Sequence, residues 1–168
     1  MAAATPGTRA LRAAGVDFEL HPYPYDAAAA RTGLQAAEAL GIAPGLVLKT
    51  LMLEADGRPA CAVIPSDREL SMKRAAAAFG ARQAGMMPVP KAERLTGYHV
   101  GGISPFGQKR RIPVAFEETV LGADRVWINA GQRGLLLSLA PAAALAALGA
   151  VGAVGAPLVA QAGRDHPE

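Results

Sequence analysis

Thr, Pro and Gly residues divide the chain into segments whose hydrophobic positions recur at helical or strand spacing. Thr5 before Pro6 is a helix-start signal, so the first helix is predicted at 6–14 and ends before Gly15. Apolar positions three or four residues apart, with similar start and stop signals, predict four further helices at 32–41, 71–80, 90–97 and 141–149.

Short apolar runs predict the strands. The most strand-like run is LVLKTLML at 46–53, which the turn ADG at 55–57 joins to a second strand at 60–64 as a candidate hairpin. Further strands are predicted at 17–23, 111–116, 125–129 and 135–139. Helices and strands interleave without a regular βαβ rhythm, and no Gly-rich phosphate fingerprint follows the first strand. The sequence therefore predicts one mixed α+β domain rather than a doubly wound sheet.

The composition narrows the class of protein. A chain of 168 residues, 51% of them hydrophobic, can bury roughly 70% of its unfolded surface and needs no metal or disulfide to hold its core. A disordered chain, a collagen and a coiled coil are excluded. The single Cys61 forms no internal disulfide, and no Cys and His residues have zinc-site spacing, so neither metal nor cofactor is expected. The N-terminus lacks the pattern of a secretory signal, which favours a cytoplasmic location.

The net charge of the chain limits how it could bind a nucleic acid. The net charge is +3, from 17 Lys and Arg against 14 Asp and Glu, and this is too small to coat a nucleic acid. Any RNA contact must therefore be a local patch. No charged residue lies between Arg133 and Arg164, but Pro141, Pro157 and several glycines interrupt that stretch. It predicts a buried strand, a short helix and an Ala/Gly-rich tail rather than a membrane span.

Lys49 stands out because both faces of its predicted strand are apolar. Two interpretations are open. In the first, the lysine protects a sheet edge against aggregation or extends its stem to water. In the second, it lies at the mouth of a pocket. In a pocket, partial burial would strengthen its attraction for an anionic or carbonyl oxygen.

The stretch TGYHVGGISPFGQKRR at 96–111 is the second unusual segment. Four glycines and Pro105 lie within a dozen positions, so the segment is either a plain loop or a stiff loop that presents main-chain N–H groups to an oxyanion. The densest basic cluster of the chain, Lys109 to Arg111, forms the end of this stretch. Beside a donor-rich loop, such a cluster could bind a phosphate backbone.

Three segments together resemble the YbaK/EbsC family of aminoacyl-tRNA deacylases. They are LVLKTLML with Lys49, the G-x-x-x-P loop at Gly101–Pro105, and GQRG at Gly131–Gly134. The resemblance runs over 5–149 and leaves 150–168 as an Ala/Gly-rich extension and tail. The family includes the editing domain inserted in bacterial prolyl-tRNA synthetases. It implies a mixed α+β fold with a curved, partly barrel-like sheet flanked by helices.

The resemblance implies a free-standing deacylase that removes a wrong amino acid from mischarged tRNA, with Cys-tRNA(Pro) favoured and prolyl-tRNA synthetase as a further partner. Lys49 would hold the terminal adenosine region or the ester. The loop residues that would orient the aminoacyl group are Gly101, Gly102, Ile103, Ser104 and Pro105. Substrate contacts are implied for Tyr23, Thr50, Asn129 and Leu136. Contacts to the acceptor stem are expected from Lys73, Arg74, Lys109, Arg110, Arg111 and Arg133.

The sequence departs from the family's cysteine-specific pattern, which has a serine and an aspartate at the places of Asn129 and Leu136. Losing a hydroxyl and a carboxylate makes the pocket less polar, which bears on the amino acid removed rather than on deacylation. The resemblance implies attack on the ester by the substrate's own thiol in cysteine-specific members and by water in alanine-specific ones. Two alternatives stay open: a module that binds tRNA or a synthetase without chemistry, and a small-ligand hydrolase that uses Cys61.

Overall fold

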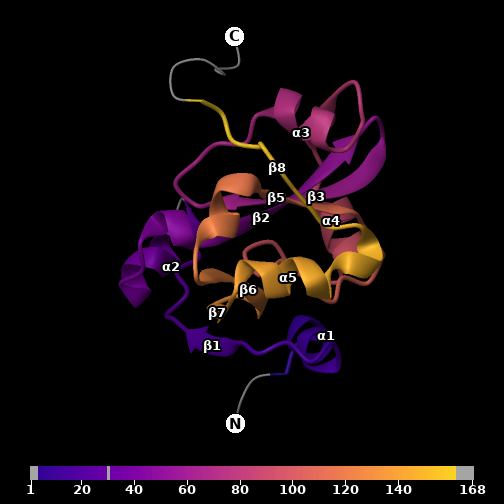
Figure 1. The fold of residues 1–168 in the computed structure, drawn as a ribbon. Helices are drawn as coiled ribbons and strands as arrows, with labels where there is room; N and C mark the ends of the chain where they lie inside the picture. Colours follow the sequence, from indigo (N-terminus) through magenta and orange to yellow (C-terminus); the bar gives the residue numbers. More distant parts are fainter. Residues whose placement is uncertain (1–3, 30, 162–168) are drawn as a thin grey trace.

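The structure is a computed structural model and describes residues 4–29 and 31–161 (Figure 1). Its helices are α1 (Pro6–Ala13), α2 (Thr32–Leu40), α3 (Met72–Ala78), α4 (Val89–Thr96) and α5 (Pro141–Ala147). Its strands are β1 (Glu19–Pro22), β2 (Leu48–Ala55), β3 (Arg58–Pro65), β4 (Ala84–Met86), β5 (Val114–Glu117), β6 (Val126–Gln132), β7 (Leu135–Leu139) and β8 (Val154–Ala156). Short 3₁₀ turns lie at Pro44–Leu46, Glu118–Gly122 and Gly149–Val151.

The five predicted helices are confirmed to within two residues at each end, and their end signals act as expected. The Thr5 hydroxyl accepts a hydrogen bond from the Thr8 N–H (3.0 Å) at the start of α1. The Ser71 hydroxyl accepts one from the Arg74 N–H (3.2 Å) at the start of α3. Gly97, with φ +81°, ends α4 in the left-handed conformation that favours glycine.

The strands form two sheets rather than the one curved sheet that the resemblance implies. One sheet has the order β1-β7-β6 and is antiparallel, and the other has the order β4-β2-β3-β5-β8. In the second sheet β2 pairs antiparallel with β3 and β4, whereas β3–β5 and β5–β8 are parallel. A bridge between Val47 and Trp127 links the two sheets just before β2 begins. The mixed α+β class is confirmed.

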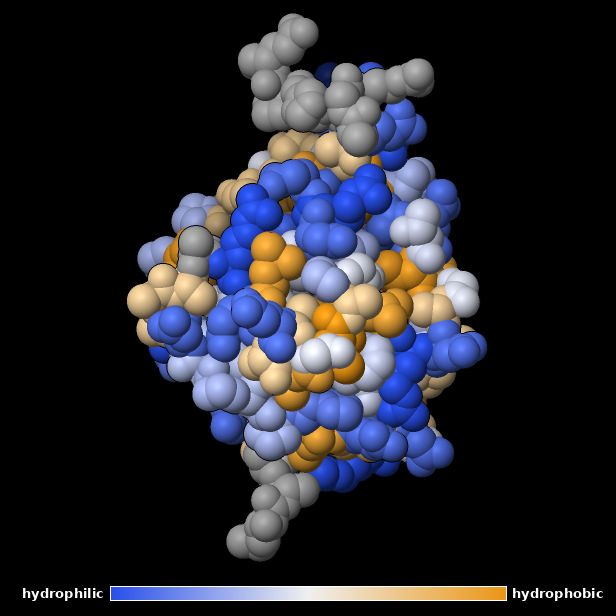
Figure 2. Space-filling model, turned by 90° about the vertical axis from the view of Figure 1, so that its left-hand side faces the viewer, coloured by the Kyte–Doolittle hydropathy of each residue, from blue (hydrophilic) through white to orange (hydrophobic). Residues whose placement is uncertain are grey.

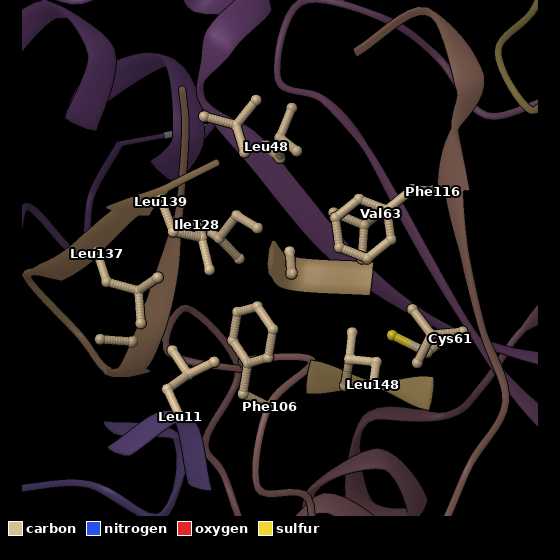
Figure 3. Close-up of a cluster of buried hydrophobic side chains, with 14 of the residues drawn as sticks. Leu11, Leu48, Cys61, Val63, Phe106, Phe116, Ile128, Leu137, Leu139 and Leu148 are labelled. Carbon is tan, nitrogen blue, oxygen red and sulfur yellow. The ribbon is translucent and has the colours of Figure 1, made fainter. Parts of the chain in front are cut away.

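The main core lies between the two sheets. Leu48 and Val63 of the larger sheet share this core with Ile128 and Leu137 of the smaller one, and Phe106 extends into it between Leu11 and Leu148 (Figure 3). Phe106 belongs to the segment 97–111, the Gly-rich stretch of the sequence, and is only 1% exposed. The loop is therefore anchored in the core at its middle, which fixes the position of the residues on either side.

The observed strands differ from the predicted ones in several places. The strand predicted from residue 46 begins at Leu48, because Pro44–Leu46 closes a 3₁₀ turn, and it runs on to Ala55. The strand predicted from 111 begins at Val114. β4 and β8 were not predicted, since their sequences AGM and VGA have no hydrophobic alternation. They are strands because an existing strand, β2 or β5, supplies the pairing partner.

The described part of the expected C-terminal extension packs on the larger sheet. β8 pairs with β5, and Leu158 is fully buried. The Ser71 N–H donates to the Leu158 carbonyl (2.8 Å), and the Ala160 N–H donates to the Glu69 carbonyl (2.8 Å). The extension therefore supports the segment that leads into α3. The rest of the expected tail, 162–168, lies outside the described residues.

The uncharged stretch does not form a membrane-spanning helix in the structure. Within residues 4–29 and 31–161, the helices are too short or too polar to cross a bilayer. The stretch instead contains β7, α5 and β8, as the prolines and glycines lead one to expect for the first two.

Candidate active site

A cavity of about 470 Å³ opens between α2, the first half of β2 and the loop that follows α4. Ligand pockets commonly have volumes of about 300–1,000 Å³. Seven residues singled out in the sequence line this cavity: Tyr23, Lys49, Thr50, Gly101, Ile103, Asn129 and Leu136. The lysine of the strand and the Gly-rich loop, 52 positions apart in the chain, therefore share one hollow.

The pairing of β2 explains how Lys49 reaches the cavity. β4 pairs only with Leu53–Ala55, so the first half of β2 is left as an open edge beside the cavity. Lys49 and Thr50 point to opposite faces of the strand, and both border the hollow because it wraps around this edge. The Thr50 hydroxyl is buried and has no hydrogen-bond partner within the described chain. Because Thr50 lines the cavity, this hydroxyl could bond to a ligand only by turning toward the hollow.

The ammonium group of Lys49 is partly buried and therefore partly removed from water. Burial lowers the pKa of its ammonium group, the negative charge of Glu69 opposes this shift, and the positive charge of Arg31 adds to it. Arg31 and Glu69 also line the cavity and face each other at 3.5 Å between Nη2 and Oε1, with both side chains exposed. A half-buried ammonium attracts an anionic oxygen more strongly than one in open water does.

The loop beside Lys49 is held by hydrogen bonds to its main chain. Asn129 Nδ2 donates to the Gly101 carbonyl (3.2 Å), and Arg133 Nε donates to the Val100 carbonyl (2.9 Å). The Gly102 N–H donates to the His99 carbonyl (2.8 Å) and is thus already used inside the loop. Donors for a substrate oxygen therefore have to come from other amides of the loop, of which Gly101 and Ile103 border the cavity.

Asn129 makes three hydrogen bonds to the main chain, which use its Oδ1 twice and one of the two Nδ2 hydrogens. Its Oδ1 accepts hydrogen bonds from the N–H groups of Gly131 (2.7 Å) and Gln132 (3.1 Å), and its Nδ2 binds the loop carbonyl described above. These bonds join the bulge between Asn129 and Gln132 in β6 to the loop. The Asn129 side chain borders the cavity, but its hydrogen bonds serve to hold the loop in place.

Alanine in place of Gly101 is expected to slow any reaction in this cavity by about tenfold or more, because a shift of the loop by about 1 Å disturbs positioning. Gly101 has φ +92°, and a Cβ there would lie 2.7 Å from the Tyr25 hydroxyl. The matched control is Gly152→Ala, at φ +83° with no atom within 4 Å, which bears only the backbone cost. Equal rates for both variants, measured as turnover of charged tRNA, the substrate that the resemblance implies, would show that the position of the loop is unimportant.

Three of the five loop residues expected to orient the substrate do not line the cavity: Gly102, Ser104 and Pro105. The amide of Gly102 is used inside the loop, as described above. Ser104 is fully buried, and its hydroxyl accepts a hydrogen bond from the Phe106 N–H (3.2 Å). Pro105 lines a second pocket of about 170 Å³ on the other side of the loop. Both residues therefore hold the shape of the loop, while Gly101 and Ile103 face the cavity.

Cys61 is placed in the core, not in the cavity. Its side chain is 0% exposed, and burial raises the pKa of the thiol to about 12. A thiol that is neither ionised nor accessible cannot serve as a nucleophile, which counts against a hydrolase that uses Cys61. The described residues contain no group of three or more His, Cys, Asp or Glu side chains that could hold a metal ion.

The basic residues expected to contact tRNA lie in three places. Lys73 and Arg74 are on α3, and Arg74 Nη1 donates to the Val159 carbonyl (2.9 Å). Lys109, Arg110 and Arg111 are exposed beyond the loop, and the two arginines line the second pocket. Arg133 is closest to the main cavity: it lies over the ring of Tyr25, one of the lining residues (5.7 Å to the centroid).

Several lining residues were missed by sequence reasoning. They include Tyr25, Arg31, Ser66, Glu69, Met86, Val89 and Val100. Most lie in loops or at helix starts, where periodicity carries no signal. One signal was available at Gly33: a Cβ there would collide with the Ser66 hydroxyl, so this glycine marks a close approach of α2 to the end of β3.

With this geometry established, the comparison with known proteins decides the family. The model of the aminoacyl-tRNA editing domain matches residues 27–147, which include α2, β2, the loop and β6. The chain belongs to the aminoacyl-tRNA editing family. The matched region contains every cavity residue singled out in the sequence except Tyr23.

Relatives within the editing family are of two kinds. A protein of Enterococcus faecalis, EbsC, described as a candidate Cys-tRNA(Pro)/Cys-tRNA(Cys) deacylase, is 38% identical over 110 residues, which cover 65% of this chain and 67% of that one. A proline–tRNA ligase of Acidithiobacillus ferrooxidans is 31% identical over 109 residues, or 59% of this chain but 19% of the ligase. The chain thus matches only a small part of the ligase.

A solved structure shows the same fold. A candidate trans-editing enzyme for prolyl tRNA synthetase superposes with a TM-score of 0.77 over 95% of this chain and 100% of that chain, at 23% sequence identity. At this identity the likeness shows a shared fold.

Proposed function

We propose that the protein deacylates mischarged aminoacyl-tRNA, with the aminoacyl group in the 470 Å³ cavity and the ester beside Lys49. The observation that carries this proposal is the convergence of a half-buried ammonium and a braced main-chain loop on one hollow. Membership of the aminoacyl-tRNA editing family supports it.

The residues suit ester cleavage without a side-chain base. The ester carbonyl oxygen becomes negative as a nucleophile attacks, and the Lys49 ammonium with main-chain N–H groups of the loop stabilises that charge. The nucleophile is water, which gives a free amino acid, or the thiol of a cysteinyl substrate. In the second case sulfur bonds to the carbonyl carbon, the ribose oxygen leaves with a proton, and a cyclic thioester is released.

We propose Cys-tRNA(Pro) as the favoured substrate, and prolyl-tRNA synthetase as the enzyme whose errors are corrected in the cytoplasm. Support comes from the relatives: one is described by its action on Cys-tRNA(Pro), and others are proline–tRNA ligases. Leu136, which is 3% exposed and lines the cavity, makes one wall apolar. An apolar wall suits a small side chain such as those of cysteine and alanine better than that of serine.

The test is a panel of tRNA(Pro) charged with Cys, Ala or Ser, each incubated with the protein. We expect release of cysteine to be fastest, with Pro-tRNA(Pro) left intact. Release from none of the three would overturn the proposed function. Faster release of alanine would correct the substrate but keep the activity.

A binding module without chemistry is the second candidate. The hydrogen bonds of Asn129 favour it, because they commit its oxygen and one of its two amide hydrogens to holding the main chain rather than to a reacting ester. Such a module would bind charged tRNA in a salt-dependent way and leave the ester intact. Turnover in the panel above dismisses it.

A further inference from the structure

Three large hydrophobic side chains are exposed where the cavity opens. Met86, Val89 and Val100 are 54%, 51% and 40% exposed, and all three line the cavity. Within the described chain, the other large hydrophobic side chain that is similarly exposed is that of Val154 on β8. We call Met86, Val89 and Val100 the apolar rim. Apolar surface gathered at one place on a folded domain usually marks a binding surface.

The apolar rim is a fixed surface rather than a loose one. Met86 ends β4 and pairs with Leu53 of β2, and Val89 begins α4. The Val100 N–H donates to Oε2 of Glu93, one turn along α4 from Val89 (3.0 Å). These bonds tie a strand end, a helix start and the loop into one wall of the cavity. A preorganised wall loses little entropy when a ligand binds to it.

A cation and an aromatic ring adjoin the apolar rim. Arg133 Nε donates to the carbonyl of Val100, and the guanidinium lies over the ring of Tyr25, which also lines the cavity. Arg133 itself is exposed. The opening of the cavity therefore offers an apolar surface with a positive charge at its border. The face that carries α2 is mainly hydrophilic, with hydrophobic residues gathered near its centre (Figure 2).

We propose that the apolar rim binds the 3′-terminal nucleobase of the charged RNA. This inference rests on the proposed function, because it places the aminoacyl group inside the cavity. The ester joins that group to the terminal ribose, so the base attached to the same ribose has to lie at the opening. The flat face of a base stacks on apolar side chains with little regard to its identity. A methionine such as Met86 adapts its shape to such a surface.

The positive charge of Arg133 beside the apolar rim also fits a terminal nucleotide. The phosphate that precedes the terminal nucleoside carries a negative charge within one nucleotide of the base, and Arg133 is placed to meet it. A protein partner would account for exposed apolar side chains as well, but it would not account for their place around the opening through which the ester has to enter. We therefore assign the apolar rim to a nucleotide.

The experiment uses two substrates with the same aminoacyl group. One is an acceptor-stem minihelix charged with cysteine and ending in adenosine, and the other is identical but lacks the terminal base. The double variant Met86→Ser/Val89→Ser removes two members of the apolar rim, and Val154→Ser is the matched control, 46% exposed on β8. All of these side chains are exposed, so the fold should tolerate the changes; thermal unfolding checks this.

For the substrate that carries the base, the double variant should raise KM about three- to tenfold with kcat nearly unchanged. For the substrate without the base, variant and wild type should show the same, already raised KM. Val154→Ser should match the wild type with both substrates.

The outcomes separate this inference from the proposed function. Release of no amino acid by the wild type, from either substrate or from charged tRNA, would overturn both. Turnover that responds neither to loss of the base nor to the double variant would leave the deacylase in place and overturn the assignment of the apolar rim. It would then point to a protein partner. An equal rise of KM with both substrates would show that the apolar rim shapes the cavity and does not hold the base.

Discussion

Replacing Lys49 with methionine is expected to lower the rate of deacylation by about 10² to 10³-fold, the usual loss when a group that stabilises a developing oxyanion is removed. Lys49→Arg keeps the positive charge but changes its shape, so it should retain a larger part of the rate. The measurement is single-turnover release of the amino acid from charged tRNA. The control is Lys91→Met, because Lys91 is engaged with Glu54 (2.8 Å) and lies outside the cavity lining.

The same substitution should not weaken the fold. Burial lowers the pKa of Lys49, so the unfolded chain holds this proton more firmly than the folded one does. The ammonium therefore costs stability at all pH values below its lowered pKa, and the cost fades as the pH rises toward 10.5. Lys49→Met removes the cost, and its melting temperature should equal or exceed that of the wild type at neutral pH. A slow variant that is also unstable would assign Lys49 to the fold rather than to the reaction.

Replacing Glu117 with alanine is expected to lower the free energy of unfolding by about 3 kcal/mol, which corresponds to a fall in melting temperature of roughly 6–12 °C. Glu117 is only 1% exposed. Its Oε1 accepts hydrogen bonds from the N–H groups of Leu158 (2.8 Å) and Val159 (3.1 Å), and Oε2 accepts one from Thr119 (2.9 Å). Alanine would leave these N–H groups without their charged acceptor. The control is Glu118→Ala at the exposed neighbouring position.

The stabilisation by Glu117 depends on pH in a defined direction. Burial acts to raise the pKa of this carboxyl, but hydrogen bonds from the three N–H groups and from the Thr119 side chain outweigh it, and the pKa lies below its ordinary value of 4.5. The contribution is therefore present above about pH 4.5 and is lost as the pH falls through the lowered pKa. Wild type and Glu117→Ala should become more alike in stability in acid. A stability difference between the two proteins that stays constant as the pH falls through the lowered pKa of Glu117 would contradict the assigned role of the carboxylate.

Replacing Glu117 should also disturb the lining of the cavity. The bonds from Leu158 and Val159 hold the C-terminal segment against the larger sheet, and the N–H of Ala160 in that segment binds the Glu69 carbonyl. Glu69 lines the cavity and acts on the charge of Lys49. The described residues after 149 thus support the site, although they lie beyond the matched editing domain.

Local signals were sufficient for the helices and for most strands. The Thr5 and Ser71 caps and the stop at Gly97 act between neighbouring residues, so they can be recognised without knowing the fold. The same holds for LVLKTLML, whose apolar character reflects the two buried faces of β2. β4 and β8 could not be predicted, because three residues without alternation become a strand only when another strand is there to pair with them.

The sequence by itself determined the α+β class, the family resemblance, and the two segments that bring an ammonium and a stiff loop. Tertiary structure alone decided that Gly101 and Ile103 face the cavity while Ser104 and Pro105 turn away, and that Arg31, Glu69 and the apolar rim line the same cavity as Lys49. The physical reason is that periodicity reports which face of one element is buried. Whether distant segments meet depends instead on tertiary contacts. β4 pairs with β2 only from Leu53 onward, which leaves the first half of β2 open, and Phe106 anchors the loop in the core.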